Sequence, residues 1–283
     1  MKKIIGIILI CIIVLAAYIF YTAHKLQQPP ADNPAWFLEQ KDAYADKTVV
    51  VCVGDSITHG SVCFNYVDYL SKKLGPKGFV FVNAGINSHL AYNVVQRLDE
   101  IIACKPDYVT VLIGTNDVNA TLMEKNTRRY IKEMNLPRKP DLAWFRDNLE
   151  QICTRLKAET NARIALLSLP PIGEELDHEA NKLTALYSTT IKEIAKEQGL
   201  GYLPLNETMN AYLKQHNNAP IVTYEDDPQS VMYKALIKRY LLGISLDKTS
   251  KSNGFLLLID LLHPNTLGST MIAEQIEGYI LSN

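Results

Sequence analysis

Five short runs of apolar and β-branched residues occur at intervals along the chain. Their regular spacing limits the possible fold more than any other feature of the sequence. Stretches long enough to form helices separate these runs, which lie at residues 48–53, 79–83, 108–113, 163–169 and 201–205. Regular alternation of strand and helix is typical of a parallel sheet that is covered by helices on both faces. The sequence therefore predicts an α/β fold with a central five-stranded parallel sheet.

Apolar residues recur at helical spacing in the stretches between and after these strands, so we expect helices at residues 62–74, 93–104, 142–160, 183–198 and 266–281. Parallel sheets of this kind bind ligands beyond the carboxyl ends of their strands, so we look for chemistry there. Residues 224–254 interrupt this alternation of strand and helix, and their apolar residues also recur near helical spacing. We interpret them as an insertion that forms either an extra helix packed on the domain or a lid beside the site.

The N-terminus carries an uncharged apolar run from Ile4 to Phe20, preceded by Lys2 and Lys3. A spanning helix needs about 17 or more such residues, whereas the apolar part of a signal peptide is usually about 7 to 15 residues long. Residues 1–25 are therefore predicted to form a signal anchor, an N-terminal membrane helix. Cleavage after Ala17 or Ala23 is the alternative, and it would give a secreted protein. Because positive charge favours the cytoplasmic side, the rest of the chain is predicted to be extracytoplasmic, in the periplasm or at the cell surface.

Residues 26–45 follow, and the prolines at positions 29, 30 and 34 predict an extended tether. No flexible linker divides the remainder, so residues 46–283 are predicted to be one catalytic domain. The chain has 29 basic and 30 acidic residues and no basic stripe, so nucleic acid is not expected as a partner.

The five cysteines show no spacing typical of a metal site, and we expect no metal. They are interpreted as buried free thiols, with one or two bridges among the last four as the alternative in an oxidising compartment. The five are Cys11, Cys52, Cys63, Cys104 and Cys153.

Directly after the first strand, the sequence Gly54-Asp55-Ser56 places a serine at a carboxyl strand end. A serine hydroxyl needs a neighbouring base to remove its proton during attack. Near the C-terminus, Asp260 precedes His263 by three residues, within reach if the segment makes one turn. We predict that Ser56, His263 and Asp260 form a catalytic triad in which the carboxylate orients the imidazole.

Acyl transfer also creates an oxyanion that preorganised hydrogen-bond donors stabilise. Gly85 follows the second strand and can offer a backbone N–H at close approach, and Asn116 follows the third strand with a side-chain amide. Together with the backbone N–H of Ser56, they are the predicted oxyanion hole. Asp55 and Asp117 are expected to bond local backbone or orient their neighbours, and His59 and His89 are expected to be structural.

From about Thr48 onward these blocks resemble the SGNH hydrolase superfamily, also called the GDSL esterases and lipases. Ser56 corresponds to the block I nucleophile, Gly85 to the block II glycine and Asn116 to the block III asparagine. Asp260 and His263 correspond to block V. The resemblance implies a three-layer α/β/α, flavodoxin-like sandwich and hydrolysis of esters or thioesters without a cofactor.

Within this chemistry, we expect a carboxylic ester hydrolase that forms an acyl-serine intermediate on a small acyl ester, most simply an acylated carbohydrate of the envelope. One alternative is a lipase, lysophospholipase or thioesterase that acts on acyl lipids. Another is an acyltransferase that uses the same residues. A carbohydrate-binding module without turnover is the alternative from a different functional class.

Overall fold

Five parallel strands form the centre of the protein. The computed structural model describes residues 2–224 and 227–282, except for the side chains of residues 2–8, 11 and 12. The strands are β1 (Thr48–Gly54), β2 (Phe79–Gly85), β3 (Tyr108–Leu112), β4 (Arg163–Leu167) and β5 (Gly201–Leu203). They pair in the order β2-β1-β3-β4-β5, and every neighbouring pair is parallel. This is the flavodoxin-like strand order, so the predicted five-stranded parallel sheet is confirmed.

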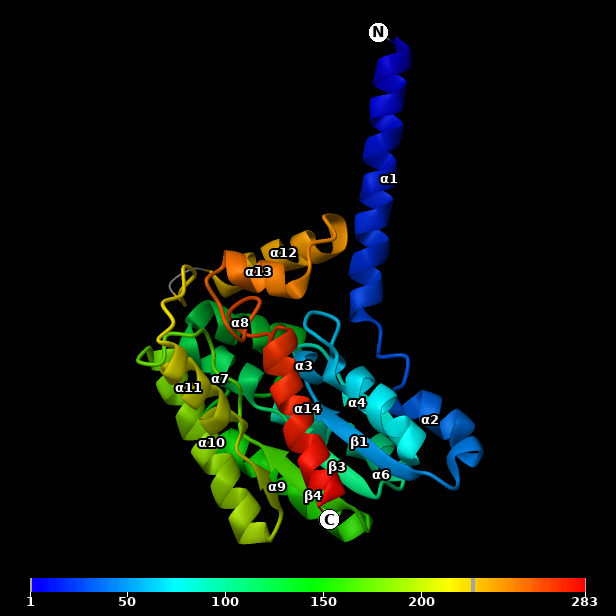
Figure 1. Ribbon diagram of the computed structural model, residues 1–283, viewed down its shortest axis with the longest axis vertical. Helices are drawn as coiled ribbons and strands as arrows, with labels where there is room; N and C mark the ends of the chain where they lie inside the picture. Colours follow the sequence, from blue (N-terminus) through cyan, green and yellow to red (C-terminus); the bar gives the residue numbers. More distant parts are fainter. Residues whose placement is uncertain (1, 225–226, 283) are drawn as a thin grey trace.

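Helices cover both faces of the sheet (Figure 1). On one face lie α4 (Tyr66–Leu74) and α14 (Thr266–Leu281), which pack together, with α11 (Leu205–His216) beside α14. On the other face lie α6 (Leu98–Ala103), α9 (Leu142–Glu159) and α10 (Glu179–Gln198). The protein is therefore an α/β sandwich of three layers.

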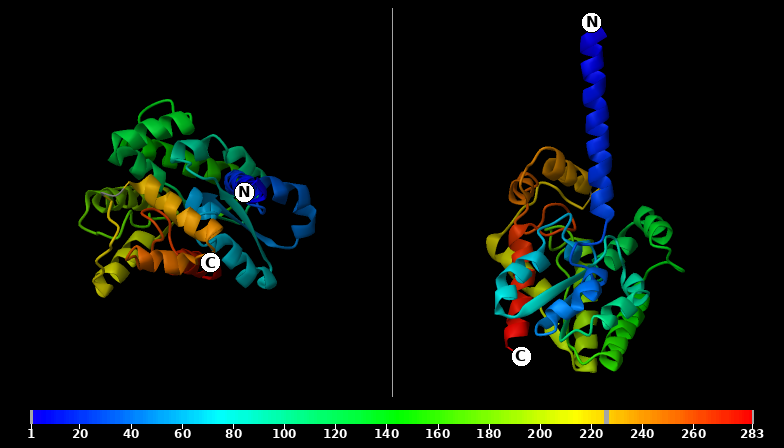
Figure 2. Two further views of the ribbon diagram at one scale, coloured as in Figure 1. Left: turned by 90° about the horizontal axis from the view of Figure 1, so that it is seen from above. Right: turned by 90° about the vertical axis from the view of Figure 1, so that its right-hand side faces the viewer.

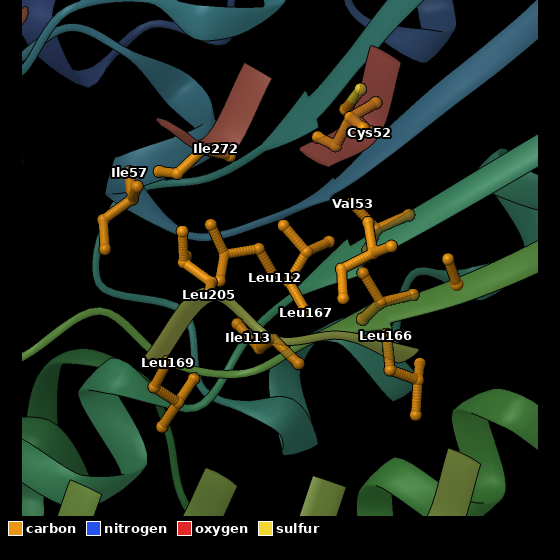
Figure 3. Packing of buried hydrophobic residues seen from close by; sticks show 14 of the residues in the cluster. Cys52, Val53, Ile57, Leu112, Ile113, Leu166, Leu167, Leu169, Leu205 and Ile272 are labelled. Carbon is orange, nitrogen blue, oxygen red and sulfur yellow. The ribbon is translucent and has the colours of Figure 1, made fainter. Parts of the chain in front are cut away.

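The core lies where these helices meet the strands, and Figure 3 shows its packing around Val53, Leu112 and Leu166. Residues 50–53 of β1 have no exposed surface. A strand covered on both faces must be apolar on both, which is why these strands read as continuous apolar runs rather than as alternating patterns.

Three predicted helices have clearly different boundaries in the structure, and one of them, α10, begins at Glu179 rather than at residue 183. The helix expected at residues 62–74 begins only at Tyr66, because Asn65 caps it by accepting the N–H of Asp68 at 3.0 Å. The helix expected at residues 93–104 is divided into α5 (Ala91–Val95) and α6. Between them, Arg97 reaches the carboxyl edge of the sheet and donates to the carbonyls of Gly54 at 3.1 Å and Ala84 at 2.7 Å.

Two helices beside the carboxyl edge of the sheet were not expected from the sequence. They are α7 (Thr115–Leu122) and α8 (Glu124–Glu133). α7 is rich in Asn, Asp and Thr, which have low intrinsic helix propensity because their side chains compete for backbone hydrogen bonds. α8 is mainly polar, and its two apolar residues, Tyr130 and Ile131, are too few to mark a helix, although its Glu, Lys and Arg residues favour one. Tertiary contacts, rather than local preference, specify α7.

The N-terminal segment forms the helix α1 (Lys2–Gln27), which projects from the sandwich (Figures 1 and 2). Among the described residues, no helix combines the length and the apolar character that crossing a bilayer requires. The predicted membrane helix at residues 1–25 is therefore unsupported, and the side chains of nine of its residues, 2–8, 11 and 12, lie outside the described part.

Within the predicted tether at residues 26–45, only residues 26–34 were expected to be extended from their prolines, and residues 34–44 form the helix α2 (Pro34–Gln40) and the 3₁₀ turn η1 (Lys41–Tyr44). The Asn33 side chain caps α2, and Pro34 occupies its first turn, where the missing N–H of proline costs no hydrogen bond. α2 packs against β2 and α6 and buries Phe37. The segment is thus part of the domain surface.

The insertion contains α12 (Pro228–Leu236), a π-helical turn η3 (Ile237–Leu241) and α13 (Leu246–Ser252). It lies above the carboxyl ends of the strands, near α8 and the end of α1 (Figures 1 and 2). The helical spacing of this segment was therefore a correct indication of helix.

Candidate active site

Ser56 is the first residue of the short helix α3 (Ser56–His59), which follows β1 through a tight turn. The Asp55 side chain caps α3 by accepting the N–H of Ile57 at 2.9 Å. A methyl group at Gly54 would lie 2.1 Å from Oγ1 of Thr58, so glycine allows α3 to fold back closely over the strand end. This turn places the Ser56 hydroxyl at the carboxyl edge of the sheet.

His263 and Asp260 meet Ser56 at this edge. The Nε2 atom of His263 lies 2.9 Å from Oγ of Ser56, and its Nδ1 atom lies 2.8 Å from Oδ2 of Asp260. The other carboxylate oxygen of Asp260 accepts the backbone N–H groups of Leu262 and His263, both at 2.7 Å. The structure thus brings together the three residues that were predicted as a triad.

The polarity of these contacts suits proton transfer. Because a carboxylate only accepts, Nδ1 of His263 must carry the proton, which leaves Nε2 to accept from the Ser56 hydroxyl. Burial alone would lower the pKa of His263, but the charge and hydrogen bond of Asp260 outweigh it and raise that pKa above its usual value. The arrangement can therefore deprotonate Ser56 during attack and store the proton on the imidazole.

A buried carboxylate anchors the loop that carries Asp260 and His263. Glu174 accepts the backbone N–H groups of three consecutive residues, Leu256 at 2.8 Å, Leu257 at 2.7 Å and Leu258 at 2.9 Å. Glu174 is only 3% exposed, so water does not compete for these bonds. The loop position, and with it the position of the imidazole, depends on this side chain.

Asn116 begins α7 and lines the same cavity as Ser56 and His263. Its Nδ2 atom donates to the backbone carbonyl of His89 at 3.0 Å and, over a longer 3.3 Å, to Oδ2 of Asp55. An oxyanion could replace the longer of these two contacts. The structure therefore places the Asn116 amide where it can serve a reacting acyl group.

Gly85 has a different setting from the one predicted. Its N–H donates to Oδ1 of Asn83 at 3.0 Å, and it is not among the described residues that line the cavity. A methyl group at Gly85 would lie 2.2 Å from the backbone nitrogen of His59. Gly85 thus allows β2 to approach α3 closely, while its N–H is already engaged.

Ser88, rather than Gly85, lines the cavity at Ser56. Its φ of +64° turns the backbone into the left-handed region. Within the described part of the chain, the backbone N–H groups of Ser88 and Ser56 have no acceptor. Sequence reasoning missed Ser88 because serine rarely adopts positive φ, so nothing in its identity marks the turn.

The cavity in front of Ser56 has a volume of about 380 Å³. Elements far apart in the sequence form its walls: Ala23, Leu26 and Gln27 of α1, Arg129, Tyr130 and Glu133 of α8, and Met232, Tyr233 and Leu236 of α12. The lining mixes apolar surface with amide, guanidinium and carboxylate groups. α1 and the insertion therefore form part of the substrate site.

The insertion is also hydrogen-bonded to the loop that follows α3. The guanidinium of Arg239 donates through Nη1 to the carbonyls of Ser61, Val62 and Cys63, at 3.1, 2.8 and 2.9 Å. The hydroxyl of Tyr240 donates to the carbonyl of Ser61 as well. Both side chains come from the π-helical turn η3. Their hydrogen bonds therefore hold the insertion against the loop that follows the Ser56 helix.

The fold and this geometry agree with a family comparison. The sequence profile of the GDSL-like lipase/acylhydrolase family matches residues 52–270. The chain belongs to this family. It is a carboxylic ester hydrolase, and the resemblance to SGNH hydrolases that the sequence motifs indicated is confirmed.

Relatives of this GDSL hydrolase include acetylxylan esterases. One from Geobacillus stearothermophilus is 26% identical over 216 residues, which cover 69% of this chain and 93% of the relative. The crystal structure of the acetyl xylan esterase AlAXEase shares the fold, with a TM-score of 0.58 and 20% identity over 82% of this chain and 99% of the other. The acetylxylan esterase Axe2 from Geobacillus stearothermophilus has a TM-score of 0.57 and 19% identity over 81% and 92%.

Two carboxyl groups near the active site of this GDSL hydrolase are buried and accept backbone N–H groups, Asp55 from its own turn, as expected, and Asp117 from a segment distant in sequence. Asp55 caps α3, and Asp117 accepts the N–H of Ala91 at 3.1 Å. Burial raises the pKa of Asp55 to about 6 and the pKa of Asp117 to about 7. Both carboxyl groups therefore hold a proton more tightly than an exposed aspartate does.

The remaining histidines near the site are hydrogen-bonded, as expected of structural residues. Nε2 of His59 lies 2.8 Å from the carbonyl of Gln28, and Nδ1 of His89 accepts from Arg97 at 3.3 Å. Burial, reinforced by Arg97, lowers the pKa of His89 to about 3. Among the described residues, no cluster of His, Cys, Asp and Glu could hold a metal ion. The free thiols Cys52, Cys63, Cys104 and Cys153 are all buried.

Proposed function

We propose that this protein removes a small acyl group from an acylated carbohydrate through an acyl-serine intermediate. The observation that carries the proposal is the 2.9 Å contact between Oγ of Ser56 and Nε2 of a histidine held by Asp260. Ser56 attacks the ester carbonyl while His263 takes its proton, and His263 then returns that proton to the departing sugar oxygen. Water, deprotonated by His263, releases the acid and restores Ser56.

Each attack places negative charge on the former carbonyl oxygen. In our proposal, three donors stabilise it: the backbone N–H groups of Ser56 and Ser88, which have no other acceptor in the described chain, and the Asn116 amide. Donors fixed in advance in a buried site stabilise such charge without reorganisation.

The cavity lining supports a carbohydrate as the alcohol part of the ester. Side chains that can bond sugar hydroxyls surround the apolar patch, namely Asn87, Asn126, Arg129, Glu133 and Gln229. The acetylxylan esterases similar to this chain support the same substrate class. If the predicted extracytoplasmic location is correct, the substrate is an acylated carbohydrate of the cell envelope.

Labelling with a fluorophosphonate probe tests the mechanism, because only an activated serine reacts. We expect labelling of the full chain and none of Ser56→Ala. The same two proteins, assayed on acetylated xylooligosaccharides, should differ by roughly 10⁴-fold or more in kcat. Activity retained by Ser56→Ala would remove Ser56 from the mechanism. Adding a sugar acceptor and analysing products separates hydrolysis from acyl transfer.

One observation favours acyl lipids as a second substrate class. An almost entirely apolar groove of about 390 Å³ lies between α1 and the segment α12–η3. Ala23, Leu26, Tyr233 and Leu236 line both this groove and the cavity at Ser56, so the two adjoin. A passage between these side chains would let an acyl chain bound to Ser56 extend into the groove.

Chain-length preference decides between the two classes. Leu236→Trp should fill the passage and reduce hydrolysis of long-chain esters at least tenfold while sparing acetyl esters. Leu242→Trp is the control, because Leu242 is exposed on the same insertion and lines neither space. If the wild type ignores long-chain esters, the lipid alternative is wrong and the carbohydrate proposal stands.

A further inference from the structure

We propose that Tyr130 is a positioning residue for the oxyanion-binding amide of Asn116, and that a chain of hydrogen bonds extends this control to Tyr224 of the insertion. The inference rests on the proposed function, in which Asn116 binds the oxyanion. We call the chain Tyr224, Asn119, Tyr130 and Asn116 the amide relay.

The surroundings of Asn116 allow one orientation of its amide. The carbonyl of His89 can only accept, so the group 3.0 Å away must be the NH₂ of Asn116. The amide oxygen therefore points to the opposite side, where the hydroxyl of Tyr130 lies 2.6 Å away. Rotation of the amide by half a turn would place two acceptors against each other at His89, and Tyr130 opposes that rotation.

The hydroxyl of Tyr130 has a defined direction as well. Nδ2 of Asn119 donates to it at 3.1 Å, so its own hydrogen is free for Oδ1 of Asn116. Tyr130 thus accepts on one side and donates on the other. Each bond of this kind polarises the next in the same sense, toward the amide hydrogens of Asn116.

The outer end of the relay begins in the insertion. The hydroxyl of Tyr224 donates to Oδ1 of Asn119 at 2.6 Å, and Nδ2 of Asn126 donates to the same oxygen at 3.0 Å. Both donors require that oxygen to face outward, which directs the Asn119 NH₂ toward Tyr130. The position of Tyr224 therefore affects the orientation of the Asn116 amide through two intervening side chains.

The side chains of the relay are buried, so water does not readily replace their hydrogen bonds. Tyr130 is 2% exposed, Asn119 1% and Tyr224 3%. If the Tyr130 hydroxyl is removed, the amide oxygen of Asn116 loses the only side-chain partner it has in the described structure. The amide then gains freedom to rotate away from the orientation that an oxyanion requires.

A double-mutant cycle with Tyr130→Phe and Asn116→Ala tests the inference. The oxyanion exists only after attack, so Tyr130→Phe should lower kcat on a small acetyl ester about tenfold with KM changed less than twofold. Asn116→Ala should lower kcat by roughly 10² to 10³. In the Asn116→Ala background, Tyr130→Phe should have no further effect, because the amide that it positions is gone.

Tyr187→Phe is the matched control, since Tyr187 is equally buried, at 1% exposure, and lies outside the relay. It should leave kcat unchanged. A wild-type kcat in folded Tyr130→Phe, or an equal loss in both backgrounds, would overturn the inference. The two proposals fail separately: an active Ser56→Ala contradicts the proposed function, whereas an inactive Ser56→Ala beside a fully active Tyr130→Phe contradicts only the relay.

Should Tyr130→Phe fail to fold, Tyr224→Phe tests the same chain from its outer end. It should lower kcat about two- to fivefold, again only when Asn116 is present. A folded Tyr224→Phe with unchanged kcat would show that the relay does not reach the insertion and would reject the proposal as stated.

Discussion

Asp260 holds His263 at two points: Oδ2 lies 2.8 Å from the ring nitrogen Nδ1, and Oδ1 accepts the backbone N–H of the same residue at 2.7 Å. The carboxylate thus fixes both the tautomer of the imidazole and the turn that presents it. Burial opposes protonation of His263, but the charge of Asp260 and its bond to Nδ1 outweigh burial and raise the pKa of His263, which has a measurable consequence.

The proposed base works only when unprotonated, so kcat/KM should fall as pH decreases through the raised pKa of His263, above 6.5. Asp260→Asn removes the charge that raises this pKa, so the acid limb should move to lower pH. The value of kcat at pH 8 should also fall, by about 10³ to 10⁴. Profiles of kcat/KM from pH 5 to 9 measure both effects. A flat wild-type profile, or an acid limb that Asp260→Asn leaves in place, would contradict the proposed role of His263.

Gly85→Ala should destabilise the protein, because the added methyl group would lie 2.2 Å from the backbone nitrogen of His59. A clash with backbone cannot be relieved by a change of rotamer, so we expect the free energy of unfolding in urea to fall by about 2 kcal/mol or more. Activity should fall too, since α3 carries Ser56. Gly75→Ala is the control, because a methyl group there meets no atom within 4 Å. Equal stability of the two variants would show that β2 and α3 can separate at no cost.

Glu174→Ala should leave three buried N–H groups, those of residues 256–258, without an acceptor. We expect a loss of about 3 kcal/mol in unfolding free energy and a low kcat, because the loop that carries His263 loosens. Glu174→Gln keeps one oxygen acceptor and should lie between this variant and the wild type. Thermal unfolding and kcat measure both. If Glu174→Ala keeps full activity, the loop is held by other contacts.

Asp117→Asn should make stability less sensitive to pH. The pKa of Asp117 is raised to about 7 in the folded state, against about 3.9 in an unfolded chain. The folded protein therefore keeps a proton that the unfolded chain has lost, and its stability decreases as pH rises from about 4 to 7. Between pH 5 and 8, ionisation of Asp117 should lower the free energy of unfolding by roughly 2 to 3 kcal/mol, and this decrease should be absent in Asp117→Asn.

Urea unfolding of both proteins at the two pH values provides the measurement. Asp46→Asn serves as the control for the substitution itself, because the Asp46 side chain is 80% exposed. The idea fails if wild type and Asp117→Asn lose the same stability between pH 5 and 8.

The sequence predicted the five strands and the residues Ser56, Asp260 and His263, because these signals are local. An apolar run of β-branched residues marks a buried strand wherever it occurs, and the strand order of a parallel sheet then brings distant loops to one edge. Asn116 was found for the same reason, since it lies in the turn from β3 into α7.

Other parts of the site depend on long-range contacts. Ser88 lies at the cavity through a left-handed turn that its residue type does not favour, and Gly85, the glycine that looked suitable, serves the packing of β2 on α3. The walls that α1 and the insertion contribute could not be foreseen either, because nothing in the residues of α1 indicates where that helix ends relative to Ser56. Tyr130 lies on a helix with few apolar residues, and nothing in the sequence indicates that its hydroxyl reaches Asn116.

The division of the active site along the chain has a consequence for biosynthesis. All five strands are complete once Leu203 has been made, yet Asp260 and His263 come later, after the insertion. A nascent chain therefore contains all five strands and Ser56 before it contains the proton acceptor. The triad is complete only after the ribosome has added that last loop, and α14, which covers one face of the sheet, follows it.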